Sequence, residues 1–382
     1  MRSTRGHEKP NRVASVDALR GFSILLLIGG EGVALALGEM LKSGGGVLSA
    51  IGGFINYQFE HAPWEGFRFW DLVFPLFIFV TGIAVVFSLS KPRTSDAGRG
   101  AAYRRIVSRA ALLFLLGILF YGGASERWPE IRLLGVLQRI ALCYLFAALL
   151  FLHLGWRGLT VVIVVILIGY WAVLVYVPVP GLGVATYQND VNLVNWIDRN
   201  FLPGKKFDGL TDPEGLLSTV PAITTCLLGV LAGIFLQNES VPPQRKAWML
   251  MIAGVAMAAA GYLWGLQFPI IKAIWTSSFV LVTGGYSLIL LGVFYLVMDV
   301  RGWQAWAIAF KWVGANALAL YFLNGVAGFQ PFTERIAGGS VSEFLDRTVA
   351  PGAGSFVTHV LALIVAIALA AYLYRRRIFI RV

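Results

Sequence analysis

The segment Phe59-Glu60-His61-Ala62-Pro63-Trp64-Glu65-Gly66 runs directly into a predominantly apolar stretch, residues 67–87. A stretch of about 20 such residues is long enough to cross the hydrocarbon core of a bilayer as a helix. A helix also satisfies its own backbone hydrogen bonds, as the bilayer interior requires. This part of the sequence therefore predicts a membrane helix with a lone histidine, His61, at its entrance.

The composition extends this conclusion to the whole chain. Of the 382 residues, 58% are hydrophobic and 13% are charged, whereas soluble domains are about half apolar and about a quarter charged. We therefore predict an all-α polytopic membrane protein, a single domain over residues 1–382 built as a bundle of about ten transmembrane helices. The predicted spans are residues 13–37, 67–89, 106–122, 133–152, 159–179, 214–236, 247–266, 275–298, 306–328 and 356–374.

Basic residues predict how the chain is oriented, because Lys and Arg near helix ends are retained in the cytoplasm. They cluster in the tail 1–12, between the second and third spans, and behind the last span. With an even number of spans these clusters share one side, so we predict that both termini are cytoplasmic. The predicted extracytoplasmic loops are residues 38–68, 180–212 and 329–355. The net charge of +11 is then an orientation signal, and we predict no nucleic-acid partner.

His61 is the first candidate for chemistry, since imidazole both accepts and returns a proton near neutral pH. It ends a glycine-rich outer loop, so it belongs either to a mobile lid over a site or, with Trp64, to an aromatic belt at the membrane interface. Asp71 follows in the first turn of the next span, where the helix dipole alone favours an acid. A carboxylate there can also receive the imidazole N–H and fix its tautomer. His61 is thus a candidate for proton transfer, and Asp71 is within geometric reach as a candidate for its orienting partner.

Ionisable side chains within membrane spans are costly and usually mark a site. Asp17 and Arg20 share a face of the first span, where they neutralise each other or reach the interface, although a guanidinium also suits a phosphate. Arg139, next to Gln138, lies one or two turns into the fourth span. It needs a buried partner, which is either an acidic side chain of another span or an anionic ligand.

Two acids of other spans, Glu31 and Asp71, are candidates for the partner of Arg139. A rise of about 1.5 Å per residue places Glu31 about 27 Å along the first span from Val13, at the outer surface and close to His61. Glycines on both sides of Glu31 permit close approach by another backbone or by a substrate.

The second outer loop leads into Thr211-Asp212-Pro213-Glu214-Gly215, a sequence typical of a helix start. We interpret Asp212 as a cap of the sixth span. Glu214 is either an acid of the first helical turn or a partner for a polar ligand such as a sugar. The two cysteines, Cys143 and Cys226, lie singly in apolar spans, so we predict neither a disulfide nor a cysteine nucleophile, and no metal.

Taken together, these segments resemble one family, the membrane-bound heparan-alpha-glucosaminide N-acetyltransferases and their shorter bacterial relatives. The resemblance covers nearly the whole chain, and the common order and spacing of its segments make it specific. The segments are Ser15-Val16-Asp17-Ala18-Leu19-Arg20-Gly21, Glu60 to Gly66 with Asp71-Leu72-Val73-Phe74-Pro75, Gly135-Val136-Leu137-Gln138-Arg139, Asp212 to Ser218, Lys272 with Ile274-Trp275-Thr276, and Gly314-Ala315-Asn316-Ala317.

The resemblance implies a transfer of acetyl from cytosolic acetyl-CoA to an amino sugar or glycan on the far side of a bacterial inner membrane. It places the active histidine of the family on His61, which acts as a base or carries the acetyl group. Asp17, Arg20, Gln138 and Arg139 are then predicted along the donor path. The predicted acceptor-binding residues are Glu31, Trp64, Glu214, Lys272, Trp275 and Asn316. Membrane lipid is a further partner, and a homodimer is left open, as is the choice between N- and O-acetylation.

The alternative is a secondary transporter for a sugar or amino sugar. Ten helices divide into two halves of five with opposite orientation, and the first and sixth spans are interrupted at Gly29-Gly30 and at Pro221. Transporters bind substrate near the middle of the membrane, whereas His61 and its aromatic neighbours lie in an outer loop. We therefore prefer the enzyme.

Overall fold

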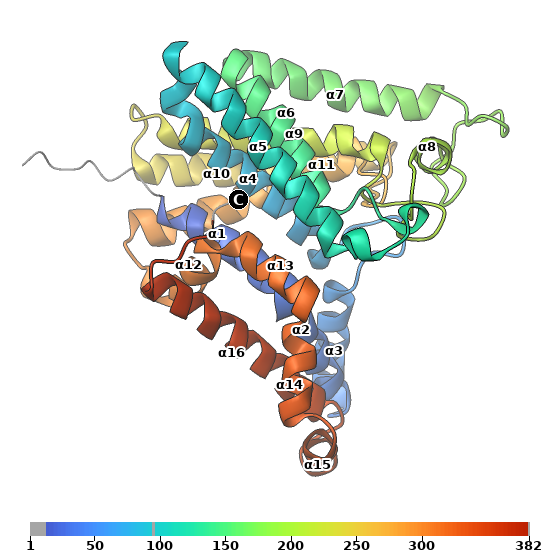
Figure 1. Cartoon of the computed structure of the whole chain (residues 1–382), viewed down its shortest axis with the longest axis vertical. Coiled ribbons are helices and arrows are strands. Elements are labelled where there is room, and N and C mark those ends of the chain that lie inside the picture. Colours follow the sequence, from blue (N-terminus) through green and yellow to red (C-terminus); the bar gives the residue numbers. More distant parts are fainter. Residues whose placement is uncertain (1–12, 94–95, 381–382) are drawn as a thin grey trace, which may run out of the picture.

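The computed structural model describes residues 13–93 and 96–380, and these residues form helices and connecting segments without a β-strand (Figure 1). The predicted basic tail 1–12 lies outside the described residues. The α-helices are α1 (Ala14–Leu25), α2 (Glu31–Lys42), α3 (Gly46–Phe59), α4 (Phe69–Arg93), α5 (Asp96–Phe120), α6 (Val136–His153), α7 (Trp156–Tyr176), α8 (Leu193–Phe201), α9 (Leu216–Gln237), α10 (Pro243–Gly265), α11 (Ser277–Tyr295), α12 (Ile308–Ala315), α13 (Ala317–Ala327), α14 (Phe329–Ala337), α15 (Ser340–Thr348) and α16 (Ala353–Arg375).

The described part of the chain contains eight helices long and apolar enough to cross a membrane. A ninth results if α12 and α13, which meet at an angle of 69°, count as one broken span. The protein is therefore a polytopic helical membrane bundle, with slightly fewer spans than the ten predicted. Two predicted spans account for the difference. The span 306–328 is divided between α12 and α13, and the span 106–122 lies in α5, which carries several arginines along its first half and leaves only a short apolar run after Arg109.

The bundle has two ends that can be followed along the chain. We call the end where α4 begins, next to His61, the site end, and the end where α4 finishes the far end. Successive spans alternate, so α11 begins at the site end and finishes near Asp299 at the far end. The Asp299 carboxylate accepts the backbone N–H groups of Ala14 and Ser15 at 2.9 and 3.0 Å, which fixes the start of α1 at the far end. Which end faces the cytoplasm stays a prediction.

The first span is kinked, as its glycines indicated. Residues Leu26–Gly30 form a π-helical turn in which Gly29 leaves the helical conformation, and α2 continues beyond it. The prediction of a flexible loop over residues 38–68 was wrong in part, because α2 extends to Lys42 and residues 46–59 form the helix α3, which packs against α2. Figure 1 shows α2, α3, α14 and α15 gathered at one corner of the molecule. The other two predicted loops also contain helices, namely α8, α14 and α15.

The core is centred on α4 and α9, which pack closely because glycines replace side chains at their crossing. A Cβ placed on Gly82 would lie 1.9 Å from the carbonyl oxygen of Cys226, and one on Gly229 would lie 1.9 Å from that of Phe79. At the far end, α1 and α12 cross in the same way at Gly21 and Gly314. This rigid packing holds the ends of α4, α6, α9 and α11 in place, and these ends carry the candidate site.

Candidate active site at the site end of the bundle

The segment before α4 is fastened to the segment before α11. The Gly66 N–H donates to the Ile270 carbonyl at 2.8 Å, and Glu65 pairs with Ile271 in an antiparallel bridge. These bonds bring Lys272, which is 211 positions away in sequence, into contact with His61. The Trp64 indole N–H donates to the Tyr187 carbonyl at 2.8 Å and so ties the same segment to the second outer loop.

His61 and Asp71 meet as the sequence predicted. The Nδ1 atom of His61 lies 2.8 Å from Oδ1 of Asp71, and the other carboxylate oxygen accepts the backbone N–H groups of Ala62 and Arg68 at 3.2 and 3.1 Å. The Asp71 side chain is 1% exposed, whereas that of His61 is 53% exposed. A buried, fully bonded carboxylate thus orients a ring that remains accessible to a substrate.

Lys272 completes a three-residue cluster with this pair. Its Nζ lies 2.9 Å from Nδ1 and 3.2 Å from Nε2 of His61, and 3.5 Å from Oδ1 of Asp71. One ring nitrogen does not both donate to Asp71 and accept from Lys272, so the two contacts at Nδ1 correspond to different tautomers. Burial lowers the pKa of Lys272, and the nearby carboxylates of Asp71 and Glu214 partly oppose this shift.

Glu31 adds a further carboxylate to this region. It begins α2, immediately after the kink of the first span, and interacts electrostatically with His61 and Lys272. The placement of Glu31 near His61, inferred from helix rise alone, agrees with the structure.

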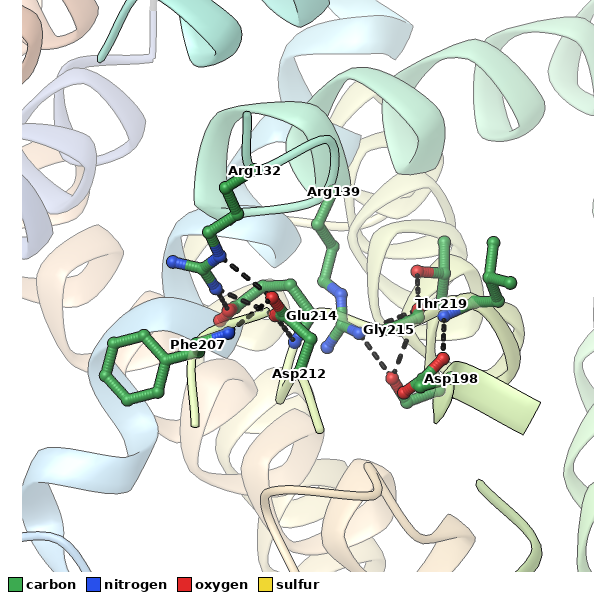
Figure 2. Close-up of polar contacts among 10 residues, drawn as sticks. Arg132, Arg139, Asp198, Phe207, Asp212, Glu214, Gly215 and Thr219 are labelled. Atoms are coloured by element: carbon green, nitrogen blue, oxygen red, sulfur yellow. Dashed lines mark hydrogen bonds and ion pairs between the residues drawn. The ribbon is translucent and has the colours of Figure 1, made fainter. Parts of the chain in front are cut away.

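A second cluster lies at the start of α6 and α9 (Figure 2) and centres on Arg132, which the sequence analysis missed. Its guanidinium donates to both carboxylate oxygens of Asp212, at 2.8 and 2.7 Å, and to Glu214 at 2.7 Å. Arg132 lies in an irregular segment, and its partners are 80 and 82 positions away. Only its position just before the Gly135 to Arg139 motif gave any signal.

The prediction that Asp212 caps the sixth span, α9, was wrong. The helix begins at Leu216, and its N–H donates to Asp198 of α8 at 2.8 Å. Asp212 instead accepts the N–H groups of Phe207 and Glu214 and binds Arg132. Burial raises the pKa of Asp198 to about 6, and burial also raises the pKa of Glu214 although two arginines oppose it.

Arg139 is fully buried and contacts neither of the acids proposed as its partner. One guanidinium nitrogen donates to the hydroxyl of Ser218 and lies 3.4 Å from the Gly215 carbonyl oxygen. The guanidinium stands 4.9 Å from the ring centroid of Trp275, whose indole N–H donates to Thr225 at 3.3 Å. Trp275 therefore connects Arg139 to the turn that carries Lys272.

Three residues that were predicted to bind the donor or the acceptor lie away from His61. Asp17 and Arg20 form an ion pair at 3.1 Å in the first turns of α1, and Arg20 also donates to the Gly314 carbonyl at 2.8 Å. They lie toward the far end, so the predicted donor residues divide between the two ends of the bundle. Asn316, predicted near the acceptor, instead binds the backbone of Ile378 and Ile380 at 3.0 and 2.9 Å, behind the last span.

Within residues 13–93 and 96–380, no group of three or more His, Cys, Asp or Glu side chains is arranged to hold a metal ion. The groups gathered at the site end are an imidazole oriented by a carboxylate, a partly exposed ammonium group, and further carboxylates and guanidinium groups.

Comparison with known proteins identifies related sequences. No family model matches the chain. The heparan-alpha-glucosaminide N-acetyltransferase of Homo sapiens is 26% identical over 368 residues, which cover 82% of this chain and 52% of the human protein. The protein of the same name from Mus musculus is 24% identical over 389 residues, or 86% of this chain and 55% of the mouse protein. The chain spans about half the length of the curated relatives it matches.

Proposed function

The chain is a distant member of the heparan-alpha-glucosaminide N-acetyltransferase family, and we propose that it is a transmembrane acetyltransferase. The donor is acetyl-CoA reaching the bundle from the far end, and the acceptor is an amino sugar or glycan at the site end. The observation that carries this proposal is the contact of His61 with both Asp71 and Lys272.

His61 serves as the general base in the first form of the mechanism. With its Nδ1–H bound by Asp71, the ring presents Nε2 to the attacking amine or hydroxyl of the acceptor. The acceptor atom bonds to the thioester carbonyl carbon, its proton passes to Nε2, and the carbon–sulfur bond breaks to release the thiolate of CoA. The imidazolium then returns the proton to that thiolate.

In the second form, Nε2 itself attacks the thioester and carries the acetyl group until the acceptor removes it. Both forms develop negative charge on the carbonyl oxygen, and both require a donor close to the ring. Lys272 is suited to this role, because its ammonium group lies 3.2 Å from Nε2 and is held there by Asp71. It turns from the ring to the oxyanion when the thioester is bound.

Side chains near His61, Asp71 and Lys272 support the proposal that the acceptor is a sugar. Trp64, three positions after His61, and Tyr187 pack against the same hydrophobic cluster, and rings of this kind stack on the faces of sugars. Glu31 and Glu214 supply carboxylates for hydroxyl or amino groups. Which sugar binds is decided by screening amino sugars with labelled acetyl-CoA in membranes.

The test uses membranes that contain wild-type protein or His61→Ala, with labelled acetyl-CoA and a panel of amino sugars. Wild type should label an external sugar, and His61→Ala should not, while the variant is still present in the membrane. Full activity of His61→Ala would remove the assignment of His61.

The kink at Leu26–Gly30 and the break between α12 and α13 favour transport as the second candidate, because transporters bind substrate at interrupted helices. Uptake of sugar by reconstituted vesicles without acetyl-CoA would support transport. Acetylated sugar outside the vesicles supports the enzyme.

A further inference from the structure

Two adjacent arginines, Arg104 and Arg105, are exposed on α5. A charged side chain on the surface of a membrane bundle is costly within the hydrocarbon and favourable at the head groups, so its level along the bundle decides what it contacts. The sequence of α5 does not define that level, because its first half is charged. The level is instead read from α6, an apolar span against which α5 packs (Figure 1).

Two contacts fix the register of α5 on α6. The Tyr103 hydroxyl lies 2.6 Å from Nε2 of His153, the last residue of α6. Further along α5, Gly117 packs against the buried Gln138 so closely that a Cβ on the glycine would lie 2.3 Å from the amide oxygen. The helices are therefore antiparallel. Trp156 follows just beyond the end of α6 and is 57% exposed, which is typical of an indole at the membrane interface.

This register places the two arginines at the end of the apolar layer. Arg104 and Arg105 are about level with Leu152 and Phe151, in the last turn of α6. The Cα–Cβ bonds of a helix point toward its N-terminus, and α5 begins at the far end, so both side chains extend toward the far surface. Each guanidinium therefore reaches the level of the phospholipid head groups.

The two arginines also flank an apolar stripe. Three leucines, which are 45%, 57% and 55% exposed, form what we call the leucine stripe: Leu112, Leu115 and Leu119. Consecutive residues of a helix diverge by about 100°, and the directions of all three leucines fall between those of Arg104 and Arg105. The first two leucines lie about 10 to 17 Å along the helix from the arginines. This is the depth of the acyl chains of one leaflet, since the whole hydrocarbon core is about 30 Å thick.

The helices around the arginines offer almost no negative charge. Asp and Glu are absent from residues 97–125 and 131–189, so α5 beyond Asp96 and the whole of α6 and α7 carry none. Arg157, at the start of α7, is exposed and adds a further positive charge. Local electrostatics therefore favour an anionic partner that comes from outside these helices.

We propose that Arg104 and Arg105 bind the phosphate of an anionic phospholipid, with an acyl chain of that lipid along the leucine stripe. A guanidinium binds phosphoryl oxygens through parallel hydrogen bonds, and one on each side of the stripe holds a phosphodiester between them. A zwitterionic lipid is disfavoured, because its own cation would meet the same positive charge. This site is independent of acetyl transfer. It accounts for a helix with four arginines packing beside an apolar span.

The test titrates the 382-residue protein in detergent with dioctanoyl phosphatidylglycerol or with dioctanoyl phosphatidylcholine. Thermal unfolding reports the affinity, and native mass spectrometry counts the bound lipid. At saturation the anionic lipid should raise the unfolding midpoint of wild type by about 2–5 °C. The zwitterionic lipid at the same concentration should raise it by less than half as much.

Ser108 allows the charge to be neutralised while both arginines stay in place. It is exposed, and it follows Arg104 by four positions and Arg105 by three, so it lies beside both. Ser108→Asp supplies the carboxylate from within the helix. It should fold as wild type does and bind phosphatidylglycerol about tenfold more weakly. Ser108→Asn, which has the same size and no charge, is the matched control and should bind as wild type does.

Removing the arginines provides a second, independent variant. Arg104→Gln combined with Arg105→Gln should also weaken the binding of phosphatidylglycerol about tenfold or more. Its control is Arg127→Gln combined with Arg335→Gln, which removes the same charge from two exposed arginines, one between α5 and α6 and one in α14. The control should keep its affinity within about twofold of wild type.

Unchanged affinity for phosphatidylglycerol in Ser108→Asp or in the double glutamine variant would overturn the site. Equal stabilisation of wild type by both lipids would show that anionic lipid is not selected. Inorganic phosphate and CoA are added as competitors. Displacement of the bound lipid by either would assign the arginines to a soluble phosphate compound and would also overturn the lipid site. Persistence of the lipid in their presence supports it.

Discussion

Arg132 binds Asp212 through two parallel hydrogen bonds of 2.8 and 2.7 Å, and both side chains are almost completely buried. The pair joins the segment before α6 to the segment before α9, and Glu214 shares the same guanidinium at 2.7 Å. A buried ion pair of this kind is costly to break, because removing one partner leaves the other charge uncompensated.

Arg132→Met should therefore destabilise the protein by about 3–5 kcal/mol, since Asp212 and Glu214 lose their common partner. The measurement is thermal unfolding in detergent. The double variant Arg132→Met with Asp212→Asn should lose less than the sum of the two single variants. Arg347→Met, which removes an exposed pair with Glu343, is the control and should leave the unfolding midpoint unchanged. Strict additivity would show that the Arg132–Asp212 pair is not coupled.

The raised pKa of Asp198 predicts how the stability of the folded protein depends on pH. Burial raises the pKa of this carboxyl from 3.8 to about 6 in the folded state. The folded protein then binds the proton more tightly than the unfolded chain, so stability falls as pH rises from about 4 to about 6. The full shift corresponds to a loss of at most about 3 kcal/mol.

Asp198→Asn keeps an oxygen for the Leu216 N–H and has no charge to bury. This variant should not lose stability between about pH 4 and about pH 6, and it should be more stable than wild type at pH 7. Unfolding midpoints between pH 4 and pH 7 test this, with the exposed Asp190→Asn as control. A steep fall that persists in Asp198→Asn would assign the pH dependence to another group.

The Gly229→Ala variant tests how much the close packing of α4 against α9 contributes to stability. Gly229→Ala would place a methyl group 1.9 Å from the Phe79 carbonyl oxygen, so the helices must separate, at a cost of about 1–3 kcal/mol. Gly169→Ala in α7 is the matched control, because nothing lies within 4 Å of its Cβ position. It should stabilise slightly through helix propensity. Equal unfolding midpoints of the two variants would show that the crossing adapts easily.

The sequence alone predicted most of the spans because a membrane helix needs only a long apolar run, and that is a local property. It misassigned α3, since the glycines of residues 44–53 indicated a flexible loop, whereas Gly38 and Gly52 permit close packing of α2 on α3. His61 and Asp71 were found because they are close in sequence. Arg132 was missed because its partners come from a segment about 80 positions away, and the tie between Gly66 and Ile270 that delivers Lys272 leaves no pattern in the sequence.

Asp71→Asn tests whether Asp71 orients His61. The amide is the same size as the carboxylate and keeps an oxygen for the backbone N–H groups of Ala62 and Arg68, so the fold and the unfolding midpoint should change little. It no longer favours the tautomer with the proton on Nδ1, and it no longer stabilises the imidazolium that forms during transfer. The rate of acetyl transfer should fall by about two to four orders of magnitude, with a smaller change in KM for acetyl-CoA. Transfer should be measured beside His61→Ala, which defines the background. Activity of Asp71→Asn within a few-fold of wild type would show that the 2.8 Å contact is structural, and that Lys272 or Glu31 sets the state of the ring instead.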